Sequence, residues 1–191
     1  MKVSKEQAAE NRERILDAAT RLFRERGFDG IGVSDLMKEV GLTHGGFYGH
    51  FASKEDLMAK ACQRAIDRAL TYWQGKIDNR HKGNPLTAIV KAYLSPAHYD
   101  DPGKGCLIAA LGSDVARQSS VVRQTVTDGT QAQIDLLTPL QPGDDDEEKR
   151  EAALALYASM IGAMVLARAV DDADFAKEIL LAVGKRAGGT L

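Results

Sequence analysis

The chain has 191 residues, of which 44% are hydrophobic and 27% are charged, and its 25 basic and 27 acidic side chains leave a net charge of −2. This composition is typical of a globular protein of one or two domains, and it excludes a disordered chain, a fibrous chain and a strongly basic nucleic-acid coat. The two cysteines are too few for a disulfide framework and the N-terminus lacks an apolar signal core, so we expect a cytoplasmic protein.

Apolar residues recur at a spacing close to 3.6 almost throughout the chain, which predicts an all-α protein. Ser4 and Gln7 have the spacing of a capping box and mark the start of the first helix. Gly27 is placed to end that helix in the left-handed conformation. Residues 28–33 are rich in glycine and aspartate, and we expect a loop there.

Two short helices with a tight turn between them are expected next. Ser34 is placed to cap the first, Gly41-Leu42-Thr43 forms the turn, and Thr43 is placed to cap the second, over residues 44–51. This order is the sequence form of a helix-turn-helix, in which the second helix enters the major groove of DNA.

The second short helix contains three glycines, Gly45, Gly46 and Gly49. Each interior glycine costs a helix about 1 kcal/mol relative to alanine. A sequence that accepts this cost indicates that another group approaches the helix closely. That group is either DNA or a neighbouring helix of the same protein.

The remainder of the chain is also expected to be helical. Ser53 and Asp56 mark the start of a long helix that runs to about residue 79, and a charged linker follows at 80–85. Acidic residues in the loop at 138–148 suit the start of a helix. The other helices are expected at 86–98, 105–117, 119–137, 148–170 and 173–185, followed by a frayed tail at Gly188-Gly189.

The helix at 148–170 is apolar on nearly all sides, so two of its faces need to be buried. One stripe contains Leu154, Tyr157, Ile161 and Val165, and a second contains Leu156, Met160, Ala163 and Met164. One face can pack on its own domain, and the other suits a two-fold partner. A central buried helix in a monomer is the alternative. The uncharged stretch at 152–167 is shorter than the ~20 residues that span a bilayer, so no membrane association is expected.

The segment GVSDLMKEVGLTHGGFYGHFASKEDL resembles the N-terminal DNA-binding domain of TetR/AcrR-type transcriptional regulators. The resemblance implies an N-terminal three-helix helix-turn-helix domain at 1–52, joined by a long helix to a helical ligand-binding and dimerisation domain at 53–191. It further implies a homodimer through the last two helices. Such a protein would be a repressor that binds a near-palindromic DNA operator and is released by a small molecule.

The same resemblance assigns DNA-contacting positions. Tyr48, His50 and Lys54 match the phosphate-contacting positions, and His44 is the candidate base reader. Ser34 and Thr43 stand at helix starts, where a hydroxyl caps the helix, contacts phosphate or does both. The full set of expected DNA-binding residues is Ser34, Thr43, His44, Gly45, Gly46, Tyr48, His50 and Lys54.

Candidate ligand-binding residues come from the expected sensing domain, where each is either pocket wall or plain core. Cys106 stands near a helix start and is either a reactive thiol or an inert buried one. The alternative function is a helical small-molecule-binding protein or, as the resemblance implies, a redox- or electrophile-sensing regulator that acts through Cys106. The set is Trp73, Tyr93, His98, Cys106, Leu107, Leu111 and Met164, with Tyr99 beside them.

No pattern of an enzyme or of a metal site stands out. The chain has no phosphate loop, nucleophile elbow, HExxH motif or paired-carboxylate pattern, so neither an enzyme nor a cofactor is expected. The histidines His44, His50, His81 and His98 have no ligand spacing with the cysteines, which predicts no structural metal. Two other classes stay open: a helical enzyme or binding protein without a DNA role, and an adaptor that binds proteins through the apolar long helix.

Overall fold

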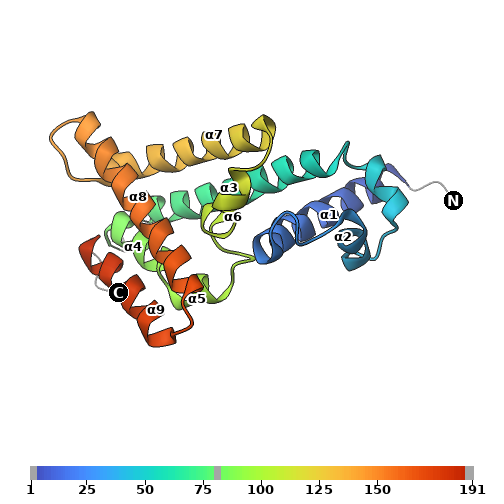
Figure 1. The fold of residues 1–191 in the computed structure, drawn as a ribbon. Coiled ribbons are helices and arrows are strands. Elements are labelled where there is room, and N and C mark those ends of the chain that lie inside the picture. The colour runs from blue at the N-terminus through green and yellow to red at the C-terminus, as the bar shows by residue number, and fades with distance from the viewer. Residues whose placement is uncertain (1–3, 80–82, 188–191) are drawn as a thin grey trace.

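The computed structural model describes residues 4–79 and 83–187. Within these ranges every regular element is a helix, as predicted, and Figure 1 shows an elongated molecule with the N-terminal helices at one end. The expected linker residues 80–82 and the Gly188-Gly189 tail lie outside the described ranges. The elements are α1 (Lys5–Arg26), α2 (Val33–Glu39), the 3-10 helix η1 (His44–Gly49), α3 (Lys54–Asp78), α4 (Pro85–Tyr93), α5 (Pro96–Asp100), α6 (Leu107–Val115), α7 (Ser120–Leu137), η3 (Thr138–Leu140), α8 (Asp146–Ala169) and α9 (Ala173–Arg186).

The helix starts show why these segments fold locally as they do. The Ser4 hydroxyl accepts a hydrogen bond from the Gln7 amide at 3.1 Å, which confirms the predicted start of α1. At α3 the capping is reciprocal: the Ser53 hydroxyl accepts from the Asp56 amide at 3.0 Å, and the Asp56 carboxylate accepts from the Ala52 amide at 3.2 Å. Each bond satisfies a backbone donor at or just before a helix start that has no partner within a helix.

The predicted caps of the two short helices are wrong in detail. Helix α2 begins at Val33 with Gly32 as its N-cap, so Ser34 lies in the first turn and does not cap. Thr43 is the N-cap residue of η1, but its side chain makes no capping hydrogen bond. The second short helix is a 3-10 helix that ends at Gly49, where the pattern predicted a helix to residue 51.

The single helix predicted at 86–98 is in fact two helices, α4 and α5. The break falls at Pro96, the first residue of α5, and the Ser95 hydroxyl accepts a hydrogen bond from the His98 amide at 3.3 Å. Proline has no amide hydrogen and disfavours helical backbone in the preceding residue, which explains the break. The turn that results places His98 beside the start of α6.

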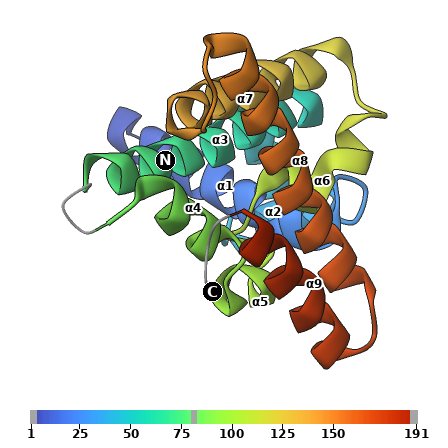
Figure 2. The same ribbon diagram turned by 90° about the vertical axis from the view of Figure 1, so that its left-hand side faces the viewer.

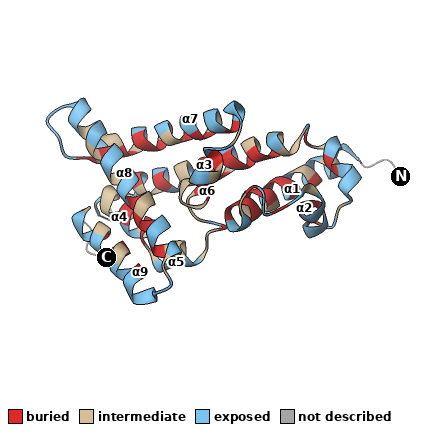
Figure 3. Ribbon diagram, viewed as in Figure 1, coloured by how far each residue is buried: buried red, intermediate tan, exposed pale blue. Residues whose placement is uncertain are grey.

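Helices α3 and α7 lie side by side along the length of the molecule (Figure 1). Gly129 makes this close approach possible, because a Cβ atom there would lie 2.4 Å from Cδ1 of Ile66. One buried apolar cluster joins α1, α2, η1 and the start of α3 to α6 and α7, and a second joins the end of α3 to α4, α7, α8 and α9 (Figure 3). The apolar core therefore continues from the N-terminal helices into α6 and α7 and does not break at residue 52.

Helices α8 and α9 pack together (Figure 2), and they lie at the end of the molecule away from α2 (Figure 1). Tyr157, Met160 and Met164 bury one face of α8, whereas the other apolar face is open to solvent. By length and composition α8 is also apolar enough to cross a membrane, although a third (33%) of its most apolar window is buried inside the structure. Four of the seven exposed large apolar side chains belong to this pair of helices: Leu154, Val165, Leu166 and Phe175.

Candidate functional site: a helix-turn-helix surface and a cavity behind it

A buried aromatic platform holds η1 in place. Phe47 and Phe51 are both buried, and their rings stack with centroids 5.7 Å apart. Tyr48, between them, is 64% exposed, and the ring of His44 meets it edge-on at 6.2 Å. The phenylalanines thus fix η1 to the core while Tyr48 and His44 face outward.

The turn between α2 and η1 depends on Gly41. Its φ is +70°, a left-handed conformation that side chains disfavour. The following amide, of Leu42, donates to the carbonyl of Met37 at 2.8 Å, which closes the end of α2. The turn sets the direction in which the chain enters η1.

The glycines of η1 are not required by packing within the described part of the chain. A Cβ atom at Gly45 or Gly49 would meet nothing within 4 Å, and one at Gly46 would make only ordinary contacts of 3.7 Å with Met37 and Thr43. None of the three has a positive φ. Contact with a neighbouring helix therefore does not explain them, and their open side faces solvent.

Two cationic side chains, Arg14 and Lys54, donate hydrogen bonds to backbone carbonyls on the two sides of α2. The Arg14 guanidinium donates to the Val40 carbonyl at 2.6 Å, at the end of α2. The Lys54 ammonium donates to the Phe28 carbonyl at 2.5 Å, in the loop before α2. One of the three ammonium hydrogens of Lys54 is thus used inside the protein, and two remain for another partner.

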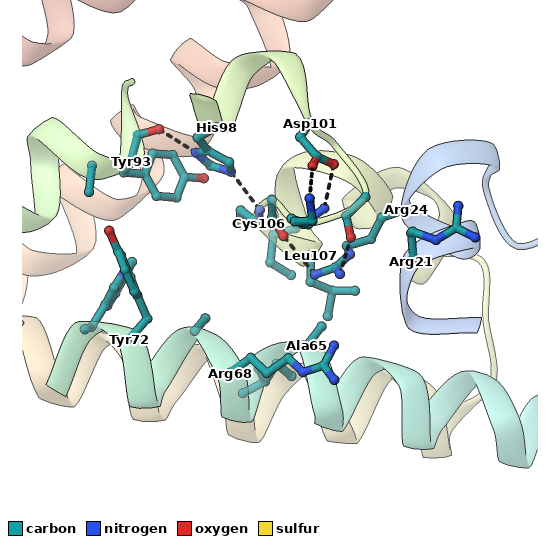
Figure 4. Close-up of a pocket in the computed structure, with 18 of the residues that line it drawn as sticks. Arg21, Arg24, Ala65, Arg68, Tyr72, Tyr93, His98, Asp101, Cys106 and Leu107 are labelled. Carbon is teal, nitrogen blue, oxygen red and sulfur yellow. Dashed lines mark hydrogen bonds and ion pairs between the residues drawn. The ribbon is translucent and has the colours of Figure 1, made fainter. Parts of the chain in front are cut away.

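A cavity of about 720 Å³ lies behind the helix-turn-helix, between α1, α3 and the segment that runs from α4 to α6 (Figure 4). Its volume is in the range of small-molecule sites, about 300–1,000 Å³. Apolar wall residues from α3 include Ala65, Ile66 and Trp73. Cationic wall residues are Arg21, Arg24, Arg68 and Lys104, and the acidic ones are Asp17 and Asp101.

The His98 ring contacts backbone atoms of both Tyr93, at the end of α4, and Cys106, just before α6. Its Nε2 accepts a hydrogen bond from the Cys106 amide at 2.8 Å, and its Nδ1 contacts the Tyr93 carbonyl at 2.5 Å. Because Nε2 accepts and a carbonyl can only accept, the ring is neutral with its hydrogen on Nδ1. Burial lowers the pKa of His98, opposed by the Tyr93 carbonyl and reinforced by Arg168 and Arg24, which agrees with a neutral ring.

This histidine predicts a pH dependence of stability. A pKa lowered in the folded state means that the unfolded chain binds the proton first, so the contribution of His98 is complete above pH 6.5 and is lost as the pH falls through the lower folded pKa. We expect the free energy of unfolding to fall more between pH 7 and 5 in the wild type than in His98→Gln. Urea unfolding, followed by the fluorescence of Trp73, the one tryptophan, measures the free energy of unfolding of the wild type and of His98→Gln at each pH. Identical pH slopes would contradict the neutral buried ring.

Comparison with known proteins identifies the fold and its N-terminal unit. Residues 15–61, which contain the helix-turn-helix and the start of α3, match the family model for bacterial regulatory proteins of the tetR family. This N-terminal part of the chain is similar to the TetR family. The family model describes bacterial regulatory proteins, and the similar proteins are named as transcriptional regulators.

Similar sequences extend only part of the way along the chain. The uncharacterized HTH-type transcriptional regulator YerO of Bacillus subtilis strain 168 is 27% identical over 117 residues, which are 60% of this chain and 40% of that protein. An HTH-type transcriptional regulator of Staphylococcus aureus strain USA300 is 34% identical over 87 residues, 46% of this chain and 47% of that protein. The matches thus span less than half the length of these relatives.

Similar structures cover nearly the whole chain. The reduced form of NemR from E. coli has a TM-score of 0.78 at 23% identity and covers 93% of this chain and 95% of that one. A TetR transcriptional regulator from Legionella pneumophila has a TM-score of 0.77 at 20% identity, with 97% and 99% covered. At such identities the likeness concerns the fold, which is the all-α TetR arrangement expected from the sequence.

The TetR fold gathers the predicted DNA-binding residues at one end of the molecule. The side chains of Ser34, Thr43, His44 and Tyr48 are exposed, as are Gly45 and Gly46, while His50 and Lys54 are half-buried. Their contact with DNA stays a prediction. The Arg14 contact was not predicted, because the carbonyl that accepts its hydrogen bond is 26 positions away and no local pattern marks it.

The cavity collects five of the seven predicted ligand-binding residues: Trp73, Tyr93, His98, Cys106 and Leu107. Leu111 and Met164 lie in the two packed apolar clusters and not in the cavity wall. Sequence reasoning missed the arginines of α1 and α3, which have the pattern of a solvated helix face. In the described ranges no group of three or more metal-ligating side chains comes together, and His81 lies outside those ranges.

Proposed function

We propose that this protein is a dimeric transcriptional repressor that binds a near-palindromic DNA operator through η1 and leaves it when a small molecule enters the cavity. The observation that carries the DNA role is the open side of η1: glycines that packing does not need, held outward on the buried Phe47–Phe51 platform. A helix surface without side chains allows a DNA backbone or base edge to come close. Such a regulator acts in the cytoplasm.

The exposed apolar faces of α8 and α9 support a two-fold dimer. Monomeric proteins seldom expose large contiguous apolar patches, and a patch that pairs with itself gives a two-fold dimer. Leu154, Val165 and Leu166 on α8 and Phe175 on α9 supply this surface. In a two-fold dimer the two η1 helices meet two half-sites related by the same axis, so the operator is near-palindromic.

The ligand response is supported by the position of the cavity. Its wall contains α1, which belongs to the DNA-binding end, and also α3, α4 and the start of α6. A ligand that binds one relative placement of these helices better than another shifts the equilibrium between them. Bound ligand and bound DNA then weaken each other by the same factor.

Selection of bound sequences from a random DNA pool tests this function. We expect enrichment of a sequence with two inverted half-sites, and the enrichment weakens when an effective ligand is added. Repeating the selection at several salt concentrations separates base-specific from phosphate contacts, since phosphate contacts give the steep salt dependence. A pool that stays random at low salt would overturn the DNA role.

A second candidate is a regulator that senses electrophiles through Cys106. The thiol stands at the N-cap of α6, lines the cavity and is partly exposed. Cys62 is buried instead, and burial raises the pKa of its thiol to about 12. N-ethylmaleimide adds to a thiol and accepts its proton on carbon. If Cys106 is the sensor, this reagent releases operator DNA from the wild type but not from Cys106→Ser. Release from both proteins, or from neither, counts against Cys106.

A further inference from the structure

Arg24 is a buried cation without a counter-ion. It comes from α1 and is only 8% exposed, and its guanidinium donates to the carbonyls of Gly103 and of Gly105, the latter at 2.9 Å. No carboxylate in the described part of the chain pairs with it. Its Nε hydrogen is buried and lacks a hydrogen-bond partner there. A buried charge in this condition costs free energy that a bound anion would recover.

A second guanidinium lines the same part of the cavity. Burial lowers the pKa of Arg24, and the positive charge of Arg68 lowers it further, so the two groups repel each other. Arg68 has one carboxylate partner, Asp17, which it shares with Arg64. Figure 4 shows Arg24 and Arg68 toward one end of the cavity and Tyr93 toward the other. The Arg24 end therefore has more positive charge than its acidic neighbours neutralise.

The other end offers a polar anchor of a different kind. Tyr93 is 6% exposed and lines the cavity, and its hydroxyl is buried without a hydrogen-bond partner in the described ranges. An unpartnered buried hydroxyl destabilises the folded protein, and a ligand acceptor removes that cost. Between the two ends the wall is largely apolar, with Ala65, Ala69 and Leu107 among its residues.

We propose that the cavity takes an elongated organic carboxylate whose acid group binds between Arg24 and Arg68, whose apolar body lies along α3, and whose far end offers a hydrogen-bond acceptor to Tyr93. This inference rests on the ligand response proposed above and names the chemical class of the ligand. It also connects ligand binding in the cavity to the DNA-binding end. Arg24 joins α1 to the Gly103 and Gly105 carbonyls before α6, so an anion that binds it acts on the connection between the DNA-binding end and the body.

Matched probes test the charge and the anchor separately. The probes are 6-hydroxy-2-naphthoate, its uncharged amide and 2-naphthoate, which lacks the hydroxyl, and calorimetry on the full chain measures each Kd. We expect the acid to bind at least about tenfold tighter than the amide, because hydrogen bonds to charged groups contribute about 1.5–3 kcal/mol. We expect Arg68→Met to weaken binding of the acid about tenfold and to leave binding of the amide nearly unchanged. Tyr93→Phe removes the advantage of the hydroxylated acid over 2-naphthoate.

Arg64→Met is the matched control, because it removes the same charge from α3 and the same partner from Asp17 but lies outside the cavity wall. We expect this variant to bind the acid as the wild type does. Equal binding of acid and amide, or equal losses in Arg64→Met and Arg68→Met, would overturn the inference. Operator release by each probe separates the two proposals. If both the acid and the amide release operator DNA, the anion inference is wrong but the ligand response stands. If the acid binds selectively and does not release operator DNA, the ligand response is wrong but the anion inference stands.

Discussion

Operator DNA is expected to bind Gly45→Leu at least about a hundredfold more weakly than the wild type, with no loss of folding stability. A Cβ atom at Gly45 meets nothing within 4 Å apart from its own stretch of the chain, so we expect the fold to accept a larger side chain there. The same side chain occupies the space in which we place the DNA. Losing contacts to one or two base pairs costs about 1–3 kcal/mol each, and a hundredfold change corresponds to about 2.7 kcal/mol.

Fluorescence anisotropy with the selected operator measures the affinity of Gly45→Leu, and urea unfolding measures its stability. Gly75→Leu is the matched control: Gly75 lies on α3, and a Cβ there also meets nothing within 4 Å. Because Gly75 is far along α3 from η1, the control keeps wild-type DNA affinity. Wild-type affinity in Gly45→Leu would show that DNA does not approach η1 at this position.

The capping-box patterns predicted the starts of α1 and α3 well because they depend on residues three positions apart, whereas the single-residue caps predicted at Ser34 and Thr43 were wrong. Ser4 and Ser53 make the expected side-chain bonds, and the acidic run before α8 provides its N-cap, where Asp145 accepts from the Glu147 and Glu148 amides. The pattern failed where two local preferences competed. Residues 86–98 keep an apolar helical spacing, but Pro96 at the start of α5 divides them into two helices.

The site shows the same division between local and distant information. The exposed residues of η1 follow from a contiguous motif, and the structure places them on one surface. Arg24, by contrast, contacts carbonyls at Gly103 and Gly105, 79 and 81 positions away, and nothing near Arg24 in the sequence marks those partners. The apolar residues Leu111 and Met164 resemble cavity residues in type, but only packing decides that they belong to the core.

The double variant Leu166→Asp/Phe175→Asp is expected to be a monomer that no longer binds operator tightly. Leu166 is 57% exposed on α8, and Phe175 is exposed at the start of α9, so neither supports the fold of its own chain. In the proposed dimer both are buried, and each carboxylate would lose its hydration there without a partner. Light scattering should then give a mass of 20.6 kDa, the mass of one chain, in place of twice that value.

Loss of the dimer affects DNA binding because the second half-site is otherwise bound as an intramolecular step. Linked binding exceeds the affinity of one module by about 10²–10⁴, so the monomer should bind the operator at least about a hundredfold more weakly. Val121→Asp is the control, since Val121 is 59% exposed but lies on α7, outside the α8–α9 surface. It should remain a dimer with wild-type affinity. A dimeric double variant would place the interface elsewhere, and a monomer that binds the full operator as tightly as the wild type would remove the need for two-fold symmetry.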